Sequence, residues 1–506
     1  MGLASWWRKL PEHTRAHIRA HWIMGMLVGA AVGALLLVLE AIDAGPVRAI
    51  NQWAYDSVTR LVAGSSTASP PTDGPRVSLI DVDDITWRDP RWGGGEPVLS
   101  PREGLARLID LAFARGASLV VLDVLAEPAA VAASQDGEHL LAETIERALA
   151  TDQRRGLVLV RSVRAPVTTR LVDQEARADR GLYFSEMRAS VPLDSLSARS
   201  GGRVVAAAPY FAYSNDHVLR DWQLFQVVCD RAADGESGTL RVMPSVQLAV
   251  LAWRQRWAAE RLPWLQGHGP CRPFPPSEPA SADAESRYRA SSYGGADFVR
   301  LERDVQIKAW NQIRELAGTR LALPATPPVA GSLNNRVVFR YLNAPRSIPA
   351  HSLLWGESQP MLDLKGDVVV IGQTYAESGD HHPTPLGVMP GATVLVNAID
   401  SLSRHGVIQK PALHVKALVL VIEIVVVAGI YALGGAVLGQ FLATLAAIVL
   451  LIPVSAILFQ HGVWLTFALP LLAIQAHAWF DLLREHRELG KQQHLQVAKA
   501  EEHSDG

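Results

Sequence analysis

At 506 residues, the chain is too long for one ordinary globular domain, and its net charge of -2 excludes the strongly basic surface typical of nucleic-acid-binding proteins. Hydrophobic residues make up 49% of the chain, and most of the excess over a water-soluble protein lies at its two ends. This composition predicts a membrane protein with a polar middle portion and no nucleic-acid partner.

The N-terminal part of the chain predicts one membrane-spanning helix. Residues 1–21 are polar and basic, and residues 22–39 then carry no charge over about the length needed to cross a bilayer. A cleaved signal peptide is the alternative interpretation, but this apolar stretch is longer than the apolar core of such peptides. Because basic residues precede the span, we predict a cytoplasmic N-terminus over residues 1–21 and a transmembrane helix over residues 22–42.

The polar middle portion shows alternating strand and helix patterns. Apolar, strand-like stretches occupy residues 76–82 and 118–124, and residues 102–115 between them place apolar side chains at helical spacing. A strand, a helix and a strand in this order predict a parallel strand pair. Residues 263–295 are rich in Pro, Ser and Ala and predict an exposed or disordered insertion. Further strand candidates are residues 156–160, 203–208 and 336–341, and residues 245–257 are a helix candidate.

Residues 364–402 combine a strand, a polar loop and a helix. Residues 367–371 predict a buried strand that ends at Gly372, and residues 392–402 predict a helix. Polar loops at the carboxyl ends of strands are where α/β folds place ligand sites. Since this strand and the two earlier ones are apolar throughout, we predict that all three share one sheet that is covered on both faces.

Polar side chains at these strand ends are the candidate ligand-binding residues. The carboxylates could converge and bind a hard cation or a positively charged ligand. The alternative is structural, with the same carboxylates capping helices and holding turns. The histidines that follow Asp380 match no metal-site spacing, and no catalytic motif is present, so we predict no metal, no cofactor and no enzymatic activity. The candidates are Asp81, Asp83, Asp123, Gln373, Thr374, Tyr375 and Asp380.

Three apolar stretches near the C-terminus predict three more spans, within a membrane region over residues 412–480. They cover residues 415–433, 438–459 and 463–480. Four crossings bring both chain ends to the same side, and basic residues beyond the last span indicate a cytoplasmic tail over residues 481–506. The expected fold is therefore an extracytoplasmic α/β domain with a mostly parallel sheet over residues 43–411, plus four transmembrane α-helices, one N-terminal and three C-terminal.

An acidic residue, Glu423, lies near the middle of the second predicted span. An ionisable group at this depth is costly when it faces lipid, so we expect it to face other helices and to find a polar partner. The available groups on neighbouring spans are Gln440, Gln475 and His477. Two interpretations stay open: a contact that transmits a signal or binds another protein's span, and a local hydrogen bond that holds the helices together.

The two cysteines of the chain, Cys229 and Cys271, both lie in the portion that we place outside the cytoplasm. Because oxidation is favoured in that compartment, we predict a disulfide between them. The alternative is two unpaired cysteines, with Cys229 buried in a strand and Cys271 in a mobile loop.

Several stretches, in this order along the chain, together resemble a known family. They are LIDVDD at 79–84, SPREGLARLIDLAFARGASLVVLDV at 100–124, SNDHVLRDWQLF at 214–225, RVVFRYLNAP at 336–345 and LKGDVVVIGQTYAESGDHHPTPLGVMPGATVLVNAIDSL at 364–402. With the closely spaced spans that follow, they resemble the CHASE sensory domain of the second class, an extracytoplasmic input domain of bacterial receptors. The resemblance implies a bacterial inner-membrane protein with a sensory outer domain.

Two classes of function remain open, and the resemblance favours the first. In the first, the outer domain senses a ligand or the state of the envelope and signals through the spans. Only about 25 residues follow the last predicted span, too few for a catalytic domain, so the effector is expected to be a separate membrane partner. In the second, the protein is a non-enzymatic structural or assembly subunit of a membrane complex. A homo-oligomer is compatible with both.

Overall fold

The computed structural model divides into two compact units. One comprises Met1–Ser65 and Ile408–Gly506, and the other comprises Ser66–Val407. The structure describes residues 11–42, 44–65, 76–95, 100–124, 135–161, 163–164, 183–185, 191–214, 216–231, 238–271, 296–318, 321, 323, 335–341, 346–356, 363–408, 413–465 and 490.

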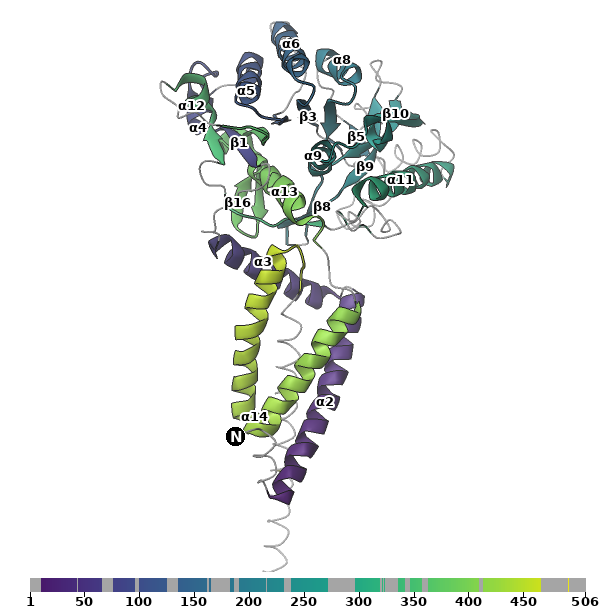
Figure 1. Ribbon diagram of the computed structural model, residues 1–506, viewed down its shortest axis with the longest axis vertical. Coiled ribbons are helices and arrows are strands. Elements are labelled where there is room, and N and C mark those ends of the chain that lie inside the picture. The colour runs from purple at the N-terminus through teal and green to yellow at the C-terminus, as the bar shows by residue number, and fades with distance from the viewer. Residues whose placement is uncertain are drawn as a thin grey trace, which may run out of the picture. The chain divides into compact units, whose positions relative to one another are not determined.

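A parallel sheet of six strands, in the order β13-β1-β14-β2-β3-β6, is the centre of the Ser66–Val407 unit (Figure 1). The strands are β1 (Val77–Val82), β2 (Leu119–Asp123), β3 (Gly156–Val160), β6 (Val204–Ala207), β13 (Ser347–Pro349) and β14 (Val368–Gln373). Strand β14 lies between β1 and β2 and pairs with both in parallel. The predictions of a mostly parallel sheet and of one sheet for these three strands are therefore confirmed.

Helices cover both faces of this sheet, and successive strand residues alternate between two cores. Val77 and Leu79 of β1 join the core that contains α9 and α13, whereas Ile80 and Val82 join the core that contains α5 and α6. Burial on both sides explains why the strands are apolar throughout. The helices are α5 (Arg102–Ala114), α6 (Gln135–Thr151), α8 (Val191–Arg199) and α12 (Ala350–Trp355) on one face, and α9 (Val246–Arg254) and α13 (Gly391–His405) on the other.

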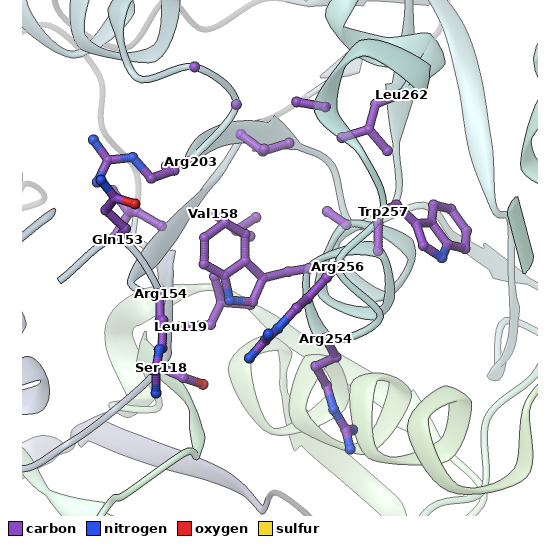
Figure 2. Close-up of a pocket in the computed structure, with 18 of the residues that line it drawn as sticks. Ser118, Leu119, Gln153, Arg154, Val158, Arg203, Arg254, Arg256, Trp257 and Leu262 are labelled. Atoms are coloured by element: carbon purple, nitrogen blue, oxygen red, sulfur yellow. The ribbon is translucent and has the colours of Figure 1, made fainter.

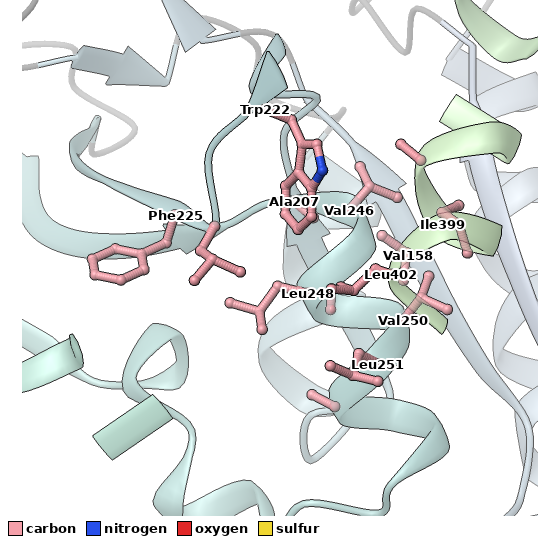
Figure 3. Close-up of a cluster of buried hydrophobic side chains, with 14 of the residues drawn as sticks. Val158, Ala207, Trp222, Phe225, Val246, Leu248, Val250, Leu251, Ile399 and Leu402 are labelled. Atoms are coloured by element: carbon pink, nitrogen blue, oxygen red, sulfur yellow. The ribbon is translucent and has the colours of Figure 1, made fainter. Parts of the chain in front are cut away.

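The core on the second face joins α9 to α13. Figure 3 shows Ile399 and Leu402 of α13 close to Val250 of α9, with Val158 of the sheet behind them. These side chains are almost fully buried, so the packing of α13 against α9 holds α13 on the sheet. The position of α13 matters for the site described below, because its first turn lies at the carboxyl end of the sheet.

Three smaller sheets extend the unit. They have the orders β11-β10-β9-β5-β4, β12-β8-β7 and β15-β16. The strands are β4 (Val163–Arg164), β5 (Tyr183–Ser185), β7 (Phe211–Tyr213), β8 (Leu219–Trp222), β9 (Phe225–Arg231), β10 (Gly238–Pro244), β11 (Gly267–Cys271), β12 (Asn335–Arg336), β15 (His381–Thr384) and β16 (Gly387–Pro390). Helix α11 (Ala296–Ala317) buries Ala309 and Trp310 in the same core as β9 and β10.

Two predicted elements differ from the structure. The start of the predicted disordered insertion is ordered, since strand β11 pairs with β10 and a 3-10 turn, Pro263–Leu265, precedes it; residues 272–295 lie outside the described residues. The strand expected over residues 336–341 is limited to β12. After Val337, whose N–H still donates to the Arg220 carbonyl of β8, the chain is bound by α13 instead of a strand. The Val338 N–H donates to Ser401 Oγ at 3.2 Å and the Arg340 N–H to Asn397 Oδ1 at 2.8 Å.

The other unit contains α2 (Glu12–Ala41), α3 (Gly45–Ser65) and α14 (Leu413–Gln460). Within the described residues, three stretches are long and apolar enough to cross a membrane: Trp22–Glu40, His414–Leu433 and Leu438–Gln460. They correspond to three of the predicted spans, and the predicted span over residues 463–480 lies almost entirely outside the described residues.

Helix α14 folds back on itself, although its helical assignment is continuous. In a straight helix, Tyr431 and Gly439 would be about 12 Å apart along the axis. A Cβ on Gly439 would instead lie 2.9 Å from Tyr431 Cα, so the two spans of α14 pack against each other. Figure 1 shows α14 as two arms.

Glycines let α2 pack closely on the first arm of α14. A Cβ on Gly29 would lie 2.9 Å from Ile424 Cγ2, and a Cβ on Gly33 would lie 2.7 Å from Leu420 Cδ2. This four-residue spacing of glycines is a known way for membrane helices to approach. At one end of the same helix pair, Lys416 Nζ lies 2.6 Å from Glu40 Oε1. The end of the first span and the start of the second therefore lie together.

Helix α3 belongs to the membrane unit, although its residues fall within the outer domain expected from the sequence. Tyr55 of α3 is fully buried, and its ring lies 5.4 Å from the rings of both Phe459 and Trp464. These edge-on aromatic contacts fix α3 against the end of α14.

Candidate functional site

The carboxyl ends of β1, β14 and β2 bring two carboxylates to one face of the sheet. Asp81 of β1 is in register with Gly372 of β14, and Gly372 is in register with Asp123 of β2. Residues in register on parallel strands point to the same face, which here is the face covered by α13. A Cβ on Gly372 would lie 2.4 Å from Ala392 Cβ, so glycine is required where α13 meets the sheet. Asp81 and Asp123 therefore lie on either side of a glycine.

A third carboxylate, Asp380, lies at the first turn of α13. Its backbone carbonyl accepts a 2.8 Å hydrogen bond from the Gly391 N–H. A Cβ on Gly391 would lie 2.0 Å from Asp380 Oδ2, so the absence of a side chain at residue 391 lets the carboxylate reach the helix end. Helix N-termini favour negative charge, which stabilises Asp380 in this place.

His382 links Asp380 to Tyr213 of β7. His382 Nε2 lies 2.7 Å from Asp380 Oδ1, and its Nδ1 is hydrogen-bonded to the Tyr213 hydroxyl. A neutral His382 donates to Asp380 and accepts from Tyr213, so both ring nitrogens are satisfied. Burial, followed by the Asp380 charge, raises the pKa of the Tyr213 hydroxyl, which keeps it a donor. Asp81, Asp123, Thr374, Asp380, His382 and Tyr213 are called the carboxyl-edge cluster below.

Two carboxyl groups of the cluster titrate close to neutral pH. Burial raises the pKa of Asp81 to about 6, although Thr374 donates a 2.5 Å hydrogen bond that favours the charged form. Burial raises the pKa of Asp123 to about 7, the nearby Asp380 charge adds to this effect, and His382 opposes it. Among the described residues, the Asp123 carboxyl group has no hydrogen-bond partner. Its charge is therefore not compensated by a donor, and the cluster can take up a proton or a cation.

The remaining candidate residues do not join the cluster. Asp83 is the N-cap of α4 (Asp84–Arg88) and accepts hydrogen bonds from the Thr86 N–H at 2.8 Å and the Thr86 hydroxyl at 2.6 Å. This position matches the structural interpretation of the acidic residues, because an N-cap satisfies a helix end. The charge of Asp83 still acts on Asp81 and contributes to its raised pKa.

Gln373 and Tyr375 lie on the opposite face of the sheet. Gln373 Nε2 donates to Ser100 Oγ at 2.6 Å, and the Tyr375 hydroxyl donates to Gln373 Oε1 at 3.4 Å. The Tyr375 ring stacks on Trp87 with ring centres 4.8 Å apart. Since strand side chains alternate, Gln373 and Thr374 point to different faces, so the structure does not bring these two candidates together.

Tyr213 and His382 are members of the cluster that the sequence did not predict as ligand-binding residues, and Tyr213 is the harder of the two to find. It is separated from His382 by 169 residues of sequence, and no pattern around it indicates a polar site. The two histidines were considered only as metal ligands. Within the described part of the chain, no group of three or more His, Cys, Asp or Glu residues is placed to hold a metal ion.

The cysteines and Glu423 are separate from the cluster. Cys229 lies on β9, is fully buried and is disulfide-bonded, and the described residues include no free cysteine. Cys271 ends β11, the second neighbour of β9 in the same sheet. Both carboxylate oxygens of Glu423 are buried without a hydrogen-bond partner among the described residues. Of its expected partners, Gln475 and His477 lie outside the described residues.

A comparison with protein families finds a match that contains the whole α/β unit. The family model described as the CHASE2 domain matches residues 30–436 of the chain. No curated protein and no solved structure matches the chain. The matched range includes the carboxyl-edge cluster, part of the first span and the second span.

Proposed function

The chain belongs to the CHASE2 domain family, and from this membership we propose that it is a membrane-anchored sensory protein whose α/β unit detects a chemical signal outside the cytoplasm. The match confirms the resemblance expected from the sequence and supports a sensory role. The observation that carries the proposal in this chain is the carboxyl-edge cluster, in which Asp123 has no donor among the described residues and Asp380 lies beside it.

The proposed topology has four spans, with both chain ends in the cytoplasm of a bacterial cell and the α/β unit on the outer side of the inner membrane. The contact between Lys416 and Glu40 supports it, since it joins the segments that lead into and out of the α/β unit at one end of the helix pair. Basic residues near both chain ends support a cytoplasmic location for them.

Topology is tested with two reporter fusions to the full chain. Alkaline phosphatase inserted after Gly95 is expected to be active, and a fluorescent protein fused after Gly506 is expected to fluoresce, because each reporter works on one side of the membrane only. An inactive phosphatase or a dark C-terminal fusion would contradict the arrangement.

The signal that we propose is a change in protonation, or the binding of a small cationic ligand, at the carboxyl-edge cluster. Uptake of a positive charge removes the repulsion between Asp123 and Asp380. It would thereby change how the first turn of α13 rests on the sheet, because Asp380 contacts Gly391 there. The spans are proposed to pass this change to an effector supplied by a separate protein, and the chain itself is proposed to have no enzymatic activity.

The experiment compares partners that co-purify with the full chain from membranes equilibrated at about pH 5.5 and about pH 8, which bracket the titration of the two carboxyl groups. Sensing predicts that the amount of bound effector changes with pH in the wild type and changes less in Asp123→Asn, where only Asp81 still titrates. A fixed stoichiometry at both pH values, equal in the variant, would contradict sensing and favour a structural or assembly subunit.

A further inference from the structure

A cavity of about 850 Å³ lies at the opposite edge of the main sheet from the carboxyl-edge cluster. Its lining includes the first residues of β2 and β3 and the C-terminal end of α9 (Figure 2). This volume is in the range of small-molecule sites. The cavity is therefore separate from the site described above and needs its own explanation.

Four arginines line this cavity: Arg154, Arg203, Arg254 and Arg256. No acidic residue is among the described residues that line it. The chain as a whole has 48 basic and 50 acidic residues, so this excess of positive charge is local and does not reflect composition. A cavity that is lined by charges of one sign focuses the electrostatic potential, and the positive potential of the arginines attracts anions.

One of these arginines is already hydrogen-bonded, and a second is directed elsewhere. Arg203 donates to the carbonyl of Leu149 at 2.7 Å, which fixes its side chain at the rim. Arg254 is directed away from Arg256 in Figure 2, and it experiences the charge of Asp400. Both arginines contribute positive charge to the cavity, but their N–H groups are not the donors that face an anion bound there.

Arg154 and Arg256 supply those donors. Within the described part of the chain, neither guanidinium has a hydrogen bond or an ion pair. In Figure 2, Arg256 extends from the end of α9 toward Ser118 and Arg154. Two planar guanidinium groups on the two sides of a cavity suit bidentate binding of a carboxylate or a phosphate.

The backbone at Arg256 adds an independent observation. Helix α9 ends with the Arg256 N–H bonded to the Trp253 carbonyl at 3.0 Å and the Trp257 N–H bonded to the Ala252 carbonyl at 3.0 Å. Arg256 has φ 51, a left-handed conformation for which glycine is the usual residue at this helix position. An arginine here reduces the stability of the fold, and it places a guanidinium over the cavity.

Part of the remaining lining is apolar, beside the polar Ser118 and Gln153. Trp253 lines the cavity, and a Cβ on Gly156 would lie 2.7 Å from its ring, so glycine makes room for the indole. Leu119, Val158 and Leu262 also line the cavity. Aromatic and aliphatic walls favour a flat apolar group, and the arginines favour a negative charge.

We propose that this cavity binds a small anion that carries a flat apolar group, with Arg154 and Arg256 holding the charged end and Trp253 contacting the flat part. The charged end is a carboxylate or a phosphate, since both present oxygen pairs to guanidinium groups. The assignment goes beyond the sensing proposal and does not depend on it.

The test measures binding of three probes to the full chain in lipid nanodiscs by calorimetry, with empty nanodiscs subtracted. The probes are 1-naphthoate, its neutral counterpart 1-naphthamide, and inorganic pyrophosphate. We expect 1-naphthoate to bind at least about tenfold more tightly than the other two, because only this probe has both features. Equal binding of 1-naphthoate and 1-naphthamide, or no binding of 1-naphthoate, would overturn the proposal.

Two variants and a matched control locate the site. Arg256→Gly and Arg154→Gln are each expected to weaken 1-naphthoate binding by about tenfold or more. Arg256→Gly is also expected to melt at the same or a higher temperature, because glycine suits the left-handed position, so lost binding cannot be attributed to unfolding. The control, Arg261→Gln, removes an exposed arginine that pairs with Glu315 outside the cavity and should leave binding unchanged.

Unchanged binding in both cavity variants would refute the assigned donors. The assay uses no partner and no signal, so its failure leaves the sensing proposal standing. Tight binding of 1-naphthoate in a protein with no pH-dependent partner would support the cavity and contradict sensing at the carboxyl-edge cluster.

Discussion

Arg102 Nε lies 2.5 Å from Glu138 Oε1, and 6% and 5% of the two side chains are exposed. This buried ion pair joins α5 to α6 on the face of the sheet away from α13. Charges that are buried together stabilise a fold only while both partners are present, since either one alone is left uncompensated. Removal of either partner should therefore destabilise the packing of α5 against α6.

We expect Glu138→Ala to lower the free energy of unfolding by about 3–5 kcal/mol, because it leaves the Arg102 charge buried without this partner. The measurement is chemical denaturation of the full chain, followed by a probe in the α/β unit. Glu315→Ala is the matched control: it breaks the exposed Arg261–Glu315 pair and should change stability by less than about 1 kcal/mol. Similar losses in both variants would contradict the role of burial.

A second prediction concerns the pH dependence of stability. Folding raises the pKa of Asp123 from 3.8 to about 7, so the folded state holds its proton at pH values where the unfolded chain has released it. Stability should therefore fall as pH rises from about 4 to about 7 and then level off. The amide in Asp123→Asn cannot ionise, so the stability of this variant should depend less on pH. At about pH 8 the variant should be more stable than the wild type, by about 1.4 kcal/mol for each unit by which folding raises the pKa of Asp123.

The pH experiment is thermal unfolding of the full chain in detergent at several pH values. Asp380→Asn is a partial comparison, since it removes only the repulsion that Asp380 exerts on Asp123 and should shift the midpoint of the wild-type profile to lower pH. Identical profiles for the wild type and Asp123→Asn would show that this carboxyl group does not titrate in that window.

The bridge at Cys229 remains a prediction about the protein isolated from membranes. If Cys229 and Cys271 are bonded, they close a loop of about 40 residues, and the loop-entropy account gives a stabilisation of about 4 kcal/mol. Cys229→Ser and Cys271→Ser should then lower stability to a similar extent. Thiol titration under denaturing, non-reducing conditions should find no free thiol in the wild type, and detection of two would reject the bridge.

Glu423 is expected to act in a contact within the membrane. Its carboxylate oxygens are buried and lack a hydrogen-bond partner among the described residues, and polar groups at this depth usually serve a function. We expect Glu423→Gln to fold with unchanged thermal stability and to retain less of a co-purifying partner. A Glu423→Leu variant with unchanged stability and unchanged partner binding would remove both the functional and the structural interpretation.

The packing of α2 on α14 gives a steric prediction. A Cβ on Gly33 would lie 2.7 Å from Leu420 Cδ2, so a branched side chain cannot fit without separating the helices. Gly33→Ile is expected to lower the melting temperature of the membrane unit in detergent. Ala30→Ile, on an exposed face of the same helix, is the control that introduces the same side chain, and an equal effect in both variants would contradict the contact.

The elements that the sequence alone predicted correctly depend on local patterns. Three spans and the strands β1, β2, β3 and β14 are visible as uncharged or apolar stretches, because burial on all sides demands apolar residues one after another. Where a segment is held by distant side chains, the local pattern misleads. Residues 338–340 have a strand-like sequence, but Ser401 and Asn397 of α13 bind the backbone of Val338 and Arg340 in place of a strand.

The composition of both candidate sites was decided by the tertiary structure. Strand ends at residues 81, 123 and 372 were expected to meet, yet only the register across β1, β14 and β2 shows that Asp81 and Asp123 share a face. Tyr213 joins them from another sheet, and Gln373 is excluded by the alternation of strand side chains. The arginines of the cavity likewise come from separate segments, namely the turn before β3, the turn before β6 and the end of α9. A local pattern records which residues need burial, whereas the meeting of polar groups depends on long-range packing that no single stretch encodes.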